Sequence, residues 1–142
     1  QVLFRSMLYP VCAPGLAAGL AATDGEEWLR HTALLQVYSG VALDDWARWL
    51  GHTPFSLDIN RAIAHFDSYS LALSAAVQGM GIAMTRDHFS TAHLAAGTLV
   101  RPFAFEAPAA EPWVLAFHRD RRNSRKVKLF QEWLLAEAQT SL

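Results

Sequence analysis

Two short polar segments follow strand-like runs and could bind a small molecule. Tyr38 and Ser39 come directly after an apolar run, and Asp67 and Ser68 come directly after a strand candidate that ends at Phe66. In an open parallel sheet, ligands bind at the carboxyl ends of the strands. The free backbone N–H groups of a helix beginning after Ser68 suit a carboxylate, and Asp67 could pair with an amine. This combination suits an amino acid or a similar zwitterion.

The second segment also has two other interpretations. Asp67 or Ser68 could simply cap the helix that follows, which is a common role of these residue types. With His65 and Ser70 they could instead indicate a hydrolase, but neighbours on one strand and turn rarely converge as nucleophile, base and orienting group. The sequence also has no GxSxG motif. Helix capping therefore stays open beside ligand binding, and we expect no catalytic residue.

The sequence predicts neither a metal site nor a nucleotide cofactor. His88 and His93 are five residues apart, which does not put them on one face of a helix. The segment Gly79-Met80-Gly81 precedes a strand, whereas a dinucleotide fingerprint follows one and opens a helix. The one cysteine, Cys12, can form no internal disulfide, which suits a reducing compartment.

Composition and charge narrow the class of protein. The 142 residues fit one globular domain, since 52% are hydrophobic and 18% are charged. The formal net charge of −1 makes this chain a poor candidate for binding DNA itself. Half of the twelve cationic residues lie within 119–128, where a phosphate or partner contact is the alternative to a solvated loop and first helical turn. We favour the solvated loop, because no exposed aromatic residues are interleaved there.

Hydrophobic periodicity predicts an α/β fold with a parallel sheet that positions these segments. Strands are expected at 2–11, 32–38, 59–66, 81–85, 98–103 and 113–117. Helices are expected at 16–22, 43–50, after 67–68, at 86–96 and at 123–138, and a Pro/Ala loop at 106–112. The expected core faces are Leu71, Ala72, Ala75, Ala76 and Gly79 in one helix, and Val127, Phe130, Leu134 and Ala138 in the last. All five tryptophans are expected to pack in the core.

Five motifs in order resemble the effector-binding domain of LysR-type bacterial transcription regulators, especially the glycine-cleavage activator subgroup. The residues that carry the resemblance are Leu8–Pro14 (LYPVCAP), Asp45–Leu50 (DWARWL), Phe66–Ser68 with Leu71–Met84 (LALSAAVQGMGIAM), Gly97–Phe103 (GTLVRPF) and Lys128–Leu134 (KLFQEWL). They extend over most of the chain, and their order and spacing are more specific than any one of them.

The resemblance implies a fold like that of the type 2 periplasmic binding proteins, with two α/β subdomains joined by two crossover strands and the effector in the cleft between them. The second subdomain would span 14–104, and residues 1–13 and 105–142 would belong to the first. The family's winged helix-turn-helix and the opening part of the first subdomain are absent from this sequence. We therefore expect an incomplete first sheet, uncovered apolar faces on the 113–117 strand and the last helix, and poor behaviour as an isolated monomer.

Carried onto matching positions, the resemblance implies a set of effector contacts: Tyr38, Ser39, Phe66, Asp67, Ser68 and Thr85. It also implies a cytoplasmic protein without a cofactor, a homo-oligomer (dimer or tetramer) in the full-length protein, and DNA binding only through the absent head. Effector would favour one arrangement of the subdomains and so change the geometry of the oligomer. The alternatives are an extracytoplasmic solute-binding protein of the same fold, or a fragment of an α/β enzyme.

Overall fold

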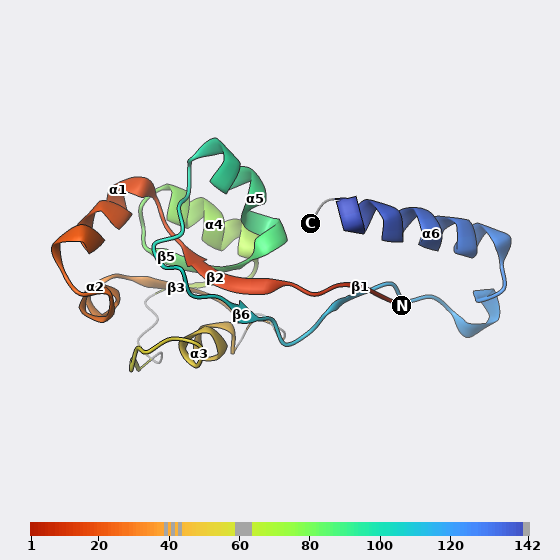
Figure 1. The fold of residues 1–142 in the computed structure, drawn as a ribbon, viewed down its shortest axis with the longest axis horizontal. Coiled ribbons are helices and arrows are strands. Elements are labelled where there is room, and N and C mark those ends of the chain that lie inside the picture. The colour runs from red at the N-terminus through yellow and green to blue at the C-terminus, as the bar shows by residue number, and fades with distance from the viewer. Residues whose placement is uncertain (39, 41, 43, 59–63, 141–142) are drawn as a thin grey trace. The chain divides into compact units, whose positions relative to one another are not determined.

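The computed structural model describes residues 1–142 except 39, 41, 43, 59–63 and 141–142 (Figure 1). The chain divides into two compact units. Unit 1 contains residues 1–6 and 111–142, and unit 2 contains residues 7–110. The subdomain limits expected at 14–104 stay a prediction, because a compact unit and a subdomain need not have the same boundaries.

Unit 2 is built on a five-stranded sheet with the order β4-β3-β5-β2-β6. The strands are β2 (Met7–Val11), β3 (Leu34–Val37), β4 (Ala64–Phe66), β5 (Ile82–Arg86) and β6 (Ala107–Pro108). The expected parallel sheet is confirmed for β3, β4 and β5, but β2 runs antiparallel to both β5 and β6. The chain enters unit 2 through β2 and leaves it through β6. These two strands therefore run in opposite directions, as their antiparallel pairing requires.

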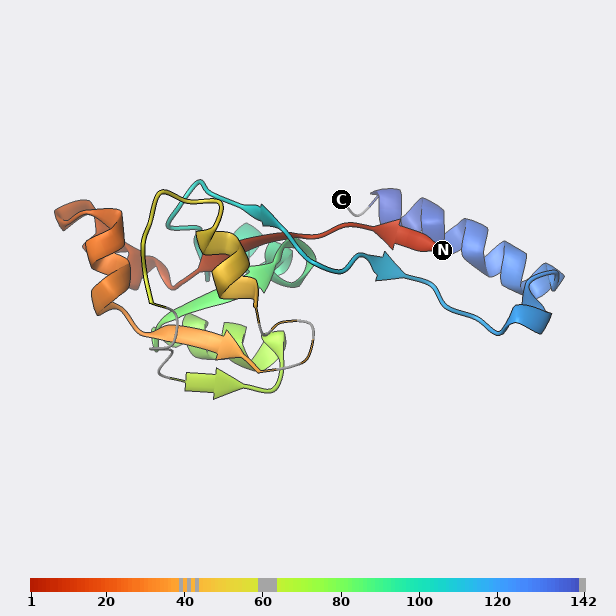
Figure 2. The same cartoon turned by 90° about the horizontal axis from the view of Figure 1, so that it is seen from below.

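Helices cover both faces of this sheet (Figures 1 and 2). Helices α2 (Gly25–His31) and α3 (Asp45–Leu50) pack on one face, and α4 (Tyr69–Val77) and α5 (Asp87–Ala96) pack on the other. Side chains alternate along each strand, so Leu34 joins the cluster under α2 and α3 while Leu35 joins the cluster under α4. Unit 2 therefore has two hydrophobic layers separated by the sheet.

The buried stripe of α4 differs from the predicted one. Ala72, Ala75 and Ala76 are buried as expected, but Leu71 and Gly79 are exposed. The stripe is instead completed by Tyr69 and Leu73. Positions 69, 72, 73 and 76 follow the i, i+3, i+4, i+7 spacing of one helical face, which excludes Leu71.

The turn between α4 and β5 depends on glycine, as the Gly79-Met80-Gly81 motif indicates. Gly79 has a φ of +79°, in the left-handed region that favours glycine. At Gly81, a Cβ atom would collide with the carbonyl oxygen of Ala33 at the start of the neighbouring strand β3. This close approach allows the Ile82 N–H to donate to the Ala33 carbonyl at 2.8 Å and to begin the pairing of β5 with β3.

Other elements depart from the expectation locally. The predicted strand at 98–103 is wrong, since only Val100 pairs there, in an isolated bridge with Cys12. Two residues of the expected 106–112 loop form β6 instead. The region expected to contain one short helix holds α1 (Pro14–Ala17), the 3-10 helix η1 (Ala18–Ala22) and then α2, which was not predicted. The Asp24 carboxylate caps α2 by accepting from the Glu26 N–H at 3.3 Å.

Unit 1 pairs β1 (Val2–Phe4) antiparallel with β7 (Trp113–Val114), followed by the 3-10 helix η3 (Arg119–Arg121) and α6 (Arg125–Thr140). No residue of α6 is fully buried. Of the predicted core face, Val127, Leu134 and Ala138 are half-buried, whereas Phe130 is exposed, so the prediction is wrong for Phe130. The short strands β1 and β7 cannot enclose both faces of α6. Its large apolar residues Leu129, Phe130 and Trp133 are 50–56% exposed.

The tryptophans divide between the two units. Trp28, Trp46 and Trp49 are buried in unit 2 as predicted, whereas Trp113 and Trp133 of unit 1 are exposed, so the packing prediction is wrong for these two. The expected uncovered apolar faces on the 113–117 segment and the last helix are present within unit 1. Among the described residues, no helix is both long and apolar enough to cross a membrane.

Candidate functional site

The ends of β3, β4 and β5 lie at one edge of the unit 2 sheet, because the three strands are parallel. We call this the carboxyl edge and define it by Tyr38 after β3, Asp67 and Ser68 after β4, and Arg86 at the end of β5. The Tyr38 N–H donates to the Phe66 carbonyl at 2.7 Å, so the ends of β3 and β4 are held side by side. Four of the predicted effector contacts are therefore neighbours.

Three polar side chains are accessible at the carboxyl edge. The Tyr38 side chain is 65% exposed, and its ring packs edge-to-face against the His65 imidazole with centroids 5.8 Å apart. Asp67 is exposed, while Phe66 is half-buried against the cluster under α4. The surface thus offers a phenol, an imidazole and a carboxylate, which can bind a polar ligand through hydrogen bonds and an aromatic contact.

Ser68 caps α4, as one of the interpretations of this turn predicted. Its Oγ accepts from the Leu71 N–H at 3.3 Å, and the residue is half-buried. Capping satisfies one of the N–H groups that a helix N-terminus leaves without an intrahelical partner. Capping and ligand binding are compatible, because a helix start has further such groups to offer.

The two remaining predicted contacts are less informative. Ser39 lies outside the described residues. Thr85 is on β5, fully buried, and its Oγ1 donates to the Arg86 carbonyl at 3.1 Å. An effector contact by Thr85 stays a prediction and would require an opening of this part of the sheet edge.

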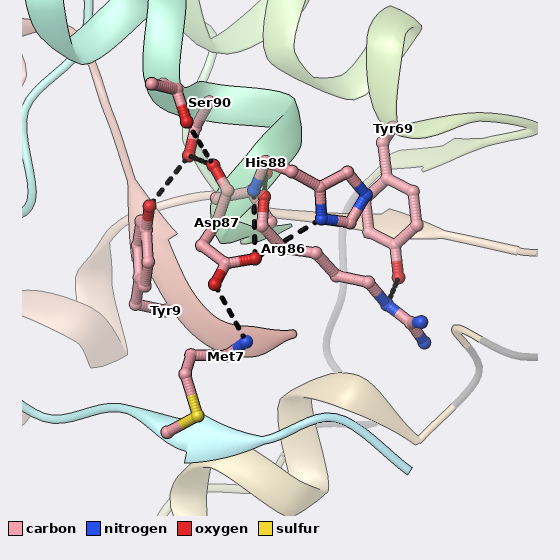
Figure 3. A network of polar contacts seen from close by, with 9 residues as sticks. Met7, Tyr9, Tyr69, Arg86, Asp87, His88 and Ser90 are labelled. Atoms are coloured by element: carbon pink, nitrogen blue, oxygen red, sulfur yellow. Dashed lines mark hydrogen bonds and ion pairs between the residues drawn. The ribbon is translucent and has the colours of Figure 1, made fainter. Parts of the chain in front are cut away.

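A buried polar network beneath the carboxyl edge was not predicted from the sequence. Arg86 donates through Nε to the Tyr69 hydroxyl at 3.0 Å (Figure 3), and Tyr69 donates to the Asp45 carboxylate. Nη2 of Arg86 lies 3.7 Å from Oδ1 of Asp45. All three residues are buried, and they join β5, α4 and α3. The sequence feature that pointed to this network was Arg86, a charged residue at the end of a largely apolar strand.

Burial sets the protonation behaviour of this network. Desolvation raises the pKa of the Asp45 carboxyl, and this effect is opposed by the Tyr69 hydrogen bond and by the charge of Arg86. Burial, together with the hydrogen bond to Asp45, also raises the pKa of Tyr69 far above its usual range, so Tyr69 stays a donor. Tyr69 is the first residue of α4, directly after Ser68. The network therefore fixes the helix start that carries the predicted effector contacts.

The raised pKa of Asp45 predicts a pH dependence of stability. Above pH 3.8 the unfolded carboxyl begins to lose its proton while the folded one still holds it, so this group's contribution to folding falls as pH rises through that window. Asp45→Asn cannot ionise and lacks this change. We expect the free energy of unfolding of the wild type minus that of the variant to decrease as pH rises from about 4 to 7, measured by urea unfolding. A difference that grows with pH would contradict the assignment.

A second set of hydrogen bonds fixes the start of α5 against β2 (Figure 3). The Asp87 carboxylate accepts from the Met7 N–H at 3.3 Å and from the His88 N–H at 2.9 Å. The Tyr9 hydroxyl lies 3.0 Å from Ser90 Oγ. These contacts are structural, since they tie a helix N-terminus to a strand within the core of unit 2.

The described residues of this edge form no catalytic arrangement. Within the described ranges, no group of three or more His, Cys, Asp or Glu side chains could hold a metal ion. Ser68 is engaged as a helix cap, and no hydrogen bond joins it to His65 or Asp67 in the described part of the chain. The arrangement is suited to binding a polar small molecule.

Comparison with known proteins identifies the chain's relatives. The model of the family described as "LysR substrate binding domain" matches residues 1–139. The glycine cleavage system transcriptional activator of Escherichia coli K12 is 27% identical over 97% of this chain, and the HTH-type transcriptional activator AmpR of Pseudomonas aeruginosa is 31% identical over 96%. The solved effector domain of AmpR from Pseudomonas aeruginosa matches 99% of this chain with a TM-score of 0.80 and 29% identity.

These matches confirm the expected fold, which is that of LysR-type effector-binding domains and is like the type 2 periplasmic binding proteins. The chain spans 44% of the length of both curated relatives and 64% of the length of the AmpR effector-domain chain. Both curated relatives are transcription regulators, and the family is not one of enzymes.

Proposed function

Because the chain belongs to the LysR substrate-binding domain family, we propose that it is the effector-binding regulatory domain of a LysR-type bacterial transcription regulator. The observation that carries the proposal is the match of the family model to residues 1–139. The accessible polar side chains of the carboxyl edge support it. An extracytoplasmic solute-binding protein and an enzyme fragment are the weaker readings, because the curated relatives are regulators.

The proposed effector site is the carboxyl edge, with Tyr38, Phe66, Asp67 and Ser68 as contacts. The exposed Asp67 carboxylate suits an ammonium group, and the start of α4 suits a carboxylate. An amino acid or a similar zwitterion would satisfy both groups at once. A purely anionic carboxylate would gain the helix start but be repelled by Asp67.

In the full-length protein, effector would act by stabilising one arrangement of the regulator over another. It can do so only through a difference in its affinity for the two arrangements. The regulator would be a cytoplasmic homo-oligomer that binds DNA through a helix-turn-helix head. AmpR of Pseudomonas aeruginosa and DsdC of Escherichia coli, two similar proteins, are both HTH-type transcription regulators.

The site is tested in the intact regulator. Amino acids and carboxylates are screened by thermal shift, and the best hit is titrated in a reporter assay. Asp67→Ala and Ser68→Ala are each expected to raise the half-maximal effector concentration about 10-fold or more, because each leaves a polar group of the ligand without a partner. Ser74→Ala is the matched control, since Ser74 is an exposed serine further along α4 whose hydroxyl donates to the Ser70 carbonyl within the helix.

Unchanged responses in both variants would overturn the site. The absence of any hit among amino acids and carboxylates would overturn the proposed effector class but leave the family unaffected.

A further inference from the structure

Unit 2 is joined to the rest of the chain at two places, before β2 and after β6. The first residue of β2 is Met7, and Phe105 lies two residues before β6. A hydrogen bond holds each of these two residues, and its other partner directly follows, or shares a helix with, a member of the buried network of Asp45, Tyr69 and Arg86. All of these residues belong to unit 2, so the contacts are internal to that unit.

Arg86 connects the buried network to the start of β2. It is the last residue of β5, where its backbone is paired with Leu8 of β2. The next residue, Asp87, accepts from the Met7 N–H through its carboxylate at 3.3 Å (Figure 3). A shift of Arg86 that moves the end of β5 therefore also moves the first two residues of β2.

Asp45 connects the buried network to the segment before β6. It is the first residue of α3, and Trp49 follows it by about one helical turn. The Trp49 indole is fully buried, and its Nε1 donates to the Phe105 carbonyl at 2.9 Å. Its ring also packs against Phe103, with centroids 5.7 Å apart. Because α3 is short and its surroundings are close-packed, a displacement of Asp45 would reach Phe105.

Tyr69 joins these two connections to the carboxyl edge. Its hydroxyl accepts from Arg86 Nε at 3.0 Å and donates to the Asp45 carboxylate. Tyr69 begins α4 directly after Ser68, one of the proposed effector contacts. All three members of the network are buried, and hydrogen bonds in such an interior strengthen one another. The start of α4, the end of β5 and the start of α3 are thus held by one shared hydroxyl.

We propose that Tyr69 is a positioning residue that couples the carboxyl edge to both connections of unit 2, an inference that rests on the proposed effector site at that edge. An effector that displaces the start of α4 would move the Tyr69 hydroxyl. Arg86 and Asp45, which share this hydroxyl, would carry the shift to β2 and to the segment before β6. Coupling of this kind is reciprocal, so a change at either connection would also alter the start of α4.

The test measures hydrogen exchange of the intact regulator by mass spectrometry, with no ligand added. Tyr69→Phe removes the shared hydroxyl and keeps the ring. Exchange is expected to become about 5-fold faster or more in both 7–11 and 105–107, because the loss of a buried hydrogen bond favours local opening. Helix α2 contains no member of the network, so its exchange should change less than about 2-fold and serves as the internal reference.

Tyr9→Phe is the matched control, because it also removes a buried phenol hydroxyl from unit 2, one that lies 3.0 Å from Ser90 Oγ. It should speed exchange in 7–11 but leave 105–107 within about 2-fold of the wild-type rate. Trp49→Phe tests reciprocity, since it removes the donor to the Phe105 carbonyl and keeps an aromatic ring. It should speed exchange in 69–73, at the start of α4, by about 3-fold or more.

Equal acceleration of α2 and of both connections in Tyr69→Phe would show a loss of global stability and overturn the proposal. Acceleration at only one connection, or an unchanged α4 start in a folded Trp49→Phe, would also overturn it. If Trp49→Phe does not fold, the comparison of Tyr69→Phe with Tyr9→Phe decides alone. Because no ligand is used, failure here leaves the effector site standing, and failure of the effector site in the reporter assay leaves these exchange rates unaffected.

Discussion

Replacing Asp45 by alanine is expected to lower the free energy of unfolding of unit 2 by about 3–5 kcal/mol, the usual cost of breaking a buried ion pair. The Asp45 and Arg86 side chains are each 5% exposed, and Tyr69 donates to the same carboxylate. Asp45→Ala removes the carboxylate beside the buried guanidinium and the acceptor of the Tyr69 hydroxyl. Chemical denaturation with hydrogen exchange on the β3 and β5 amides measures the loss within unit 2.

Asp44→Ala is the control for this prediction. Asp44 is the neighbouring acid and is exposed, so its removal should change stability by no more than about 0.5 kcal/mol. A second variant separates charge from packing. Asp45→Leu with Arg86→Met replaces both charges by apolar side chains, which often restores stability at a buried pair. Equal losses from Asp44→Ala and Asp45→Ala would contradict the network.

The same network has a consequence for the effector site. Tyr69 is anchored to α3 through Asp45 and to β5 through Arg86, while the preceding residue, Ser68, caps α4 at the carboxyl edge. The proposed contacts thus lie at a helix start that the buried network holds in place. Ligand binding would therefore cost little conformational entropy for ordering the site, which favours affinity and discrimination.

The sequence predicted the parallel part of the fold and the α4 cap because local chemistry determines them. Ser68 has the residue type and position of an N-cap, and Gly97 ends α5 with a φ of +72°. It did not predict the antiparallel pairing of β2 with β5, because register between distant segments depends on tertiary contacts. The strand expected at 98–103 failed for the same reason, since only Val100 finds a partner there.

The candidate site was predictable to a similar degree. Tyr38, Asp67 and Ser68 could be found because they follow strand-like runs, and parallel strands end at one edge. Asp45 and Tyr69 could not, because each looks like an ordinary helix-start residue until the fold brings it to Arg86.

The same tryptophan-to-alanine change is expected to destabilise unit 2 strongly and unit 1 hardly at all. Trp49 is fully buried, its ring packs against Trp46 and Phe103 with centroids 5.8 and 5.7 Å away, and its Nε1 donates to the Phe105 carbonyl at 2.9 Å. Trp49→Ala should lower the free energy of unfolding of unit 2 by about 3–5 kcal/mol, because it removes a large buried side chain and leaves a cavity. Urea unfolding followed by near-ultraviolet circular dichroism measures this loss.

Trp133 provides the matched control, since it is 55% exposed on α6. Trp133→Ala should change the free energy of unfolding by less than about 1 kcal/mol, because little packing is lost at an exposed position. It should reduce self-association of the chain in sedimentation velocity, because Trp133 and its neighbour Phe130 form part of the exposed apolar surface of α6. Loss of folding in Trp133→Ala would mean that this surface is already packed in solution. A wild-type chain that sediments as a monodisperse monomer and melts cooperatively would show that the surface needs no cover.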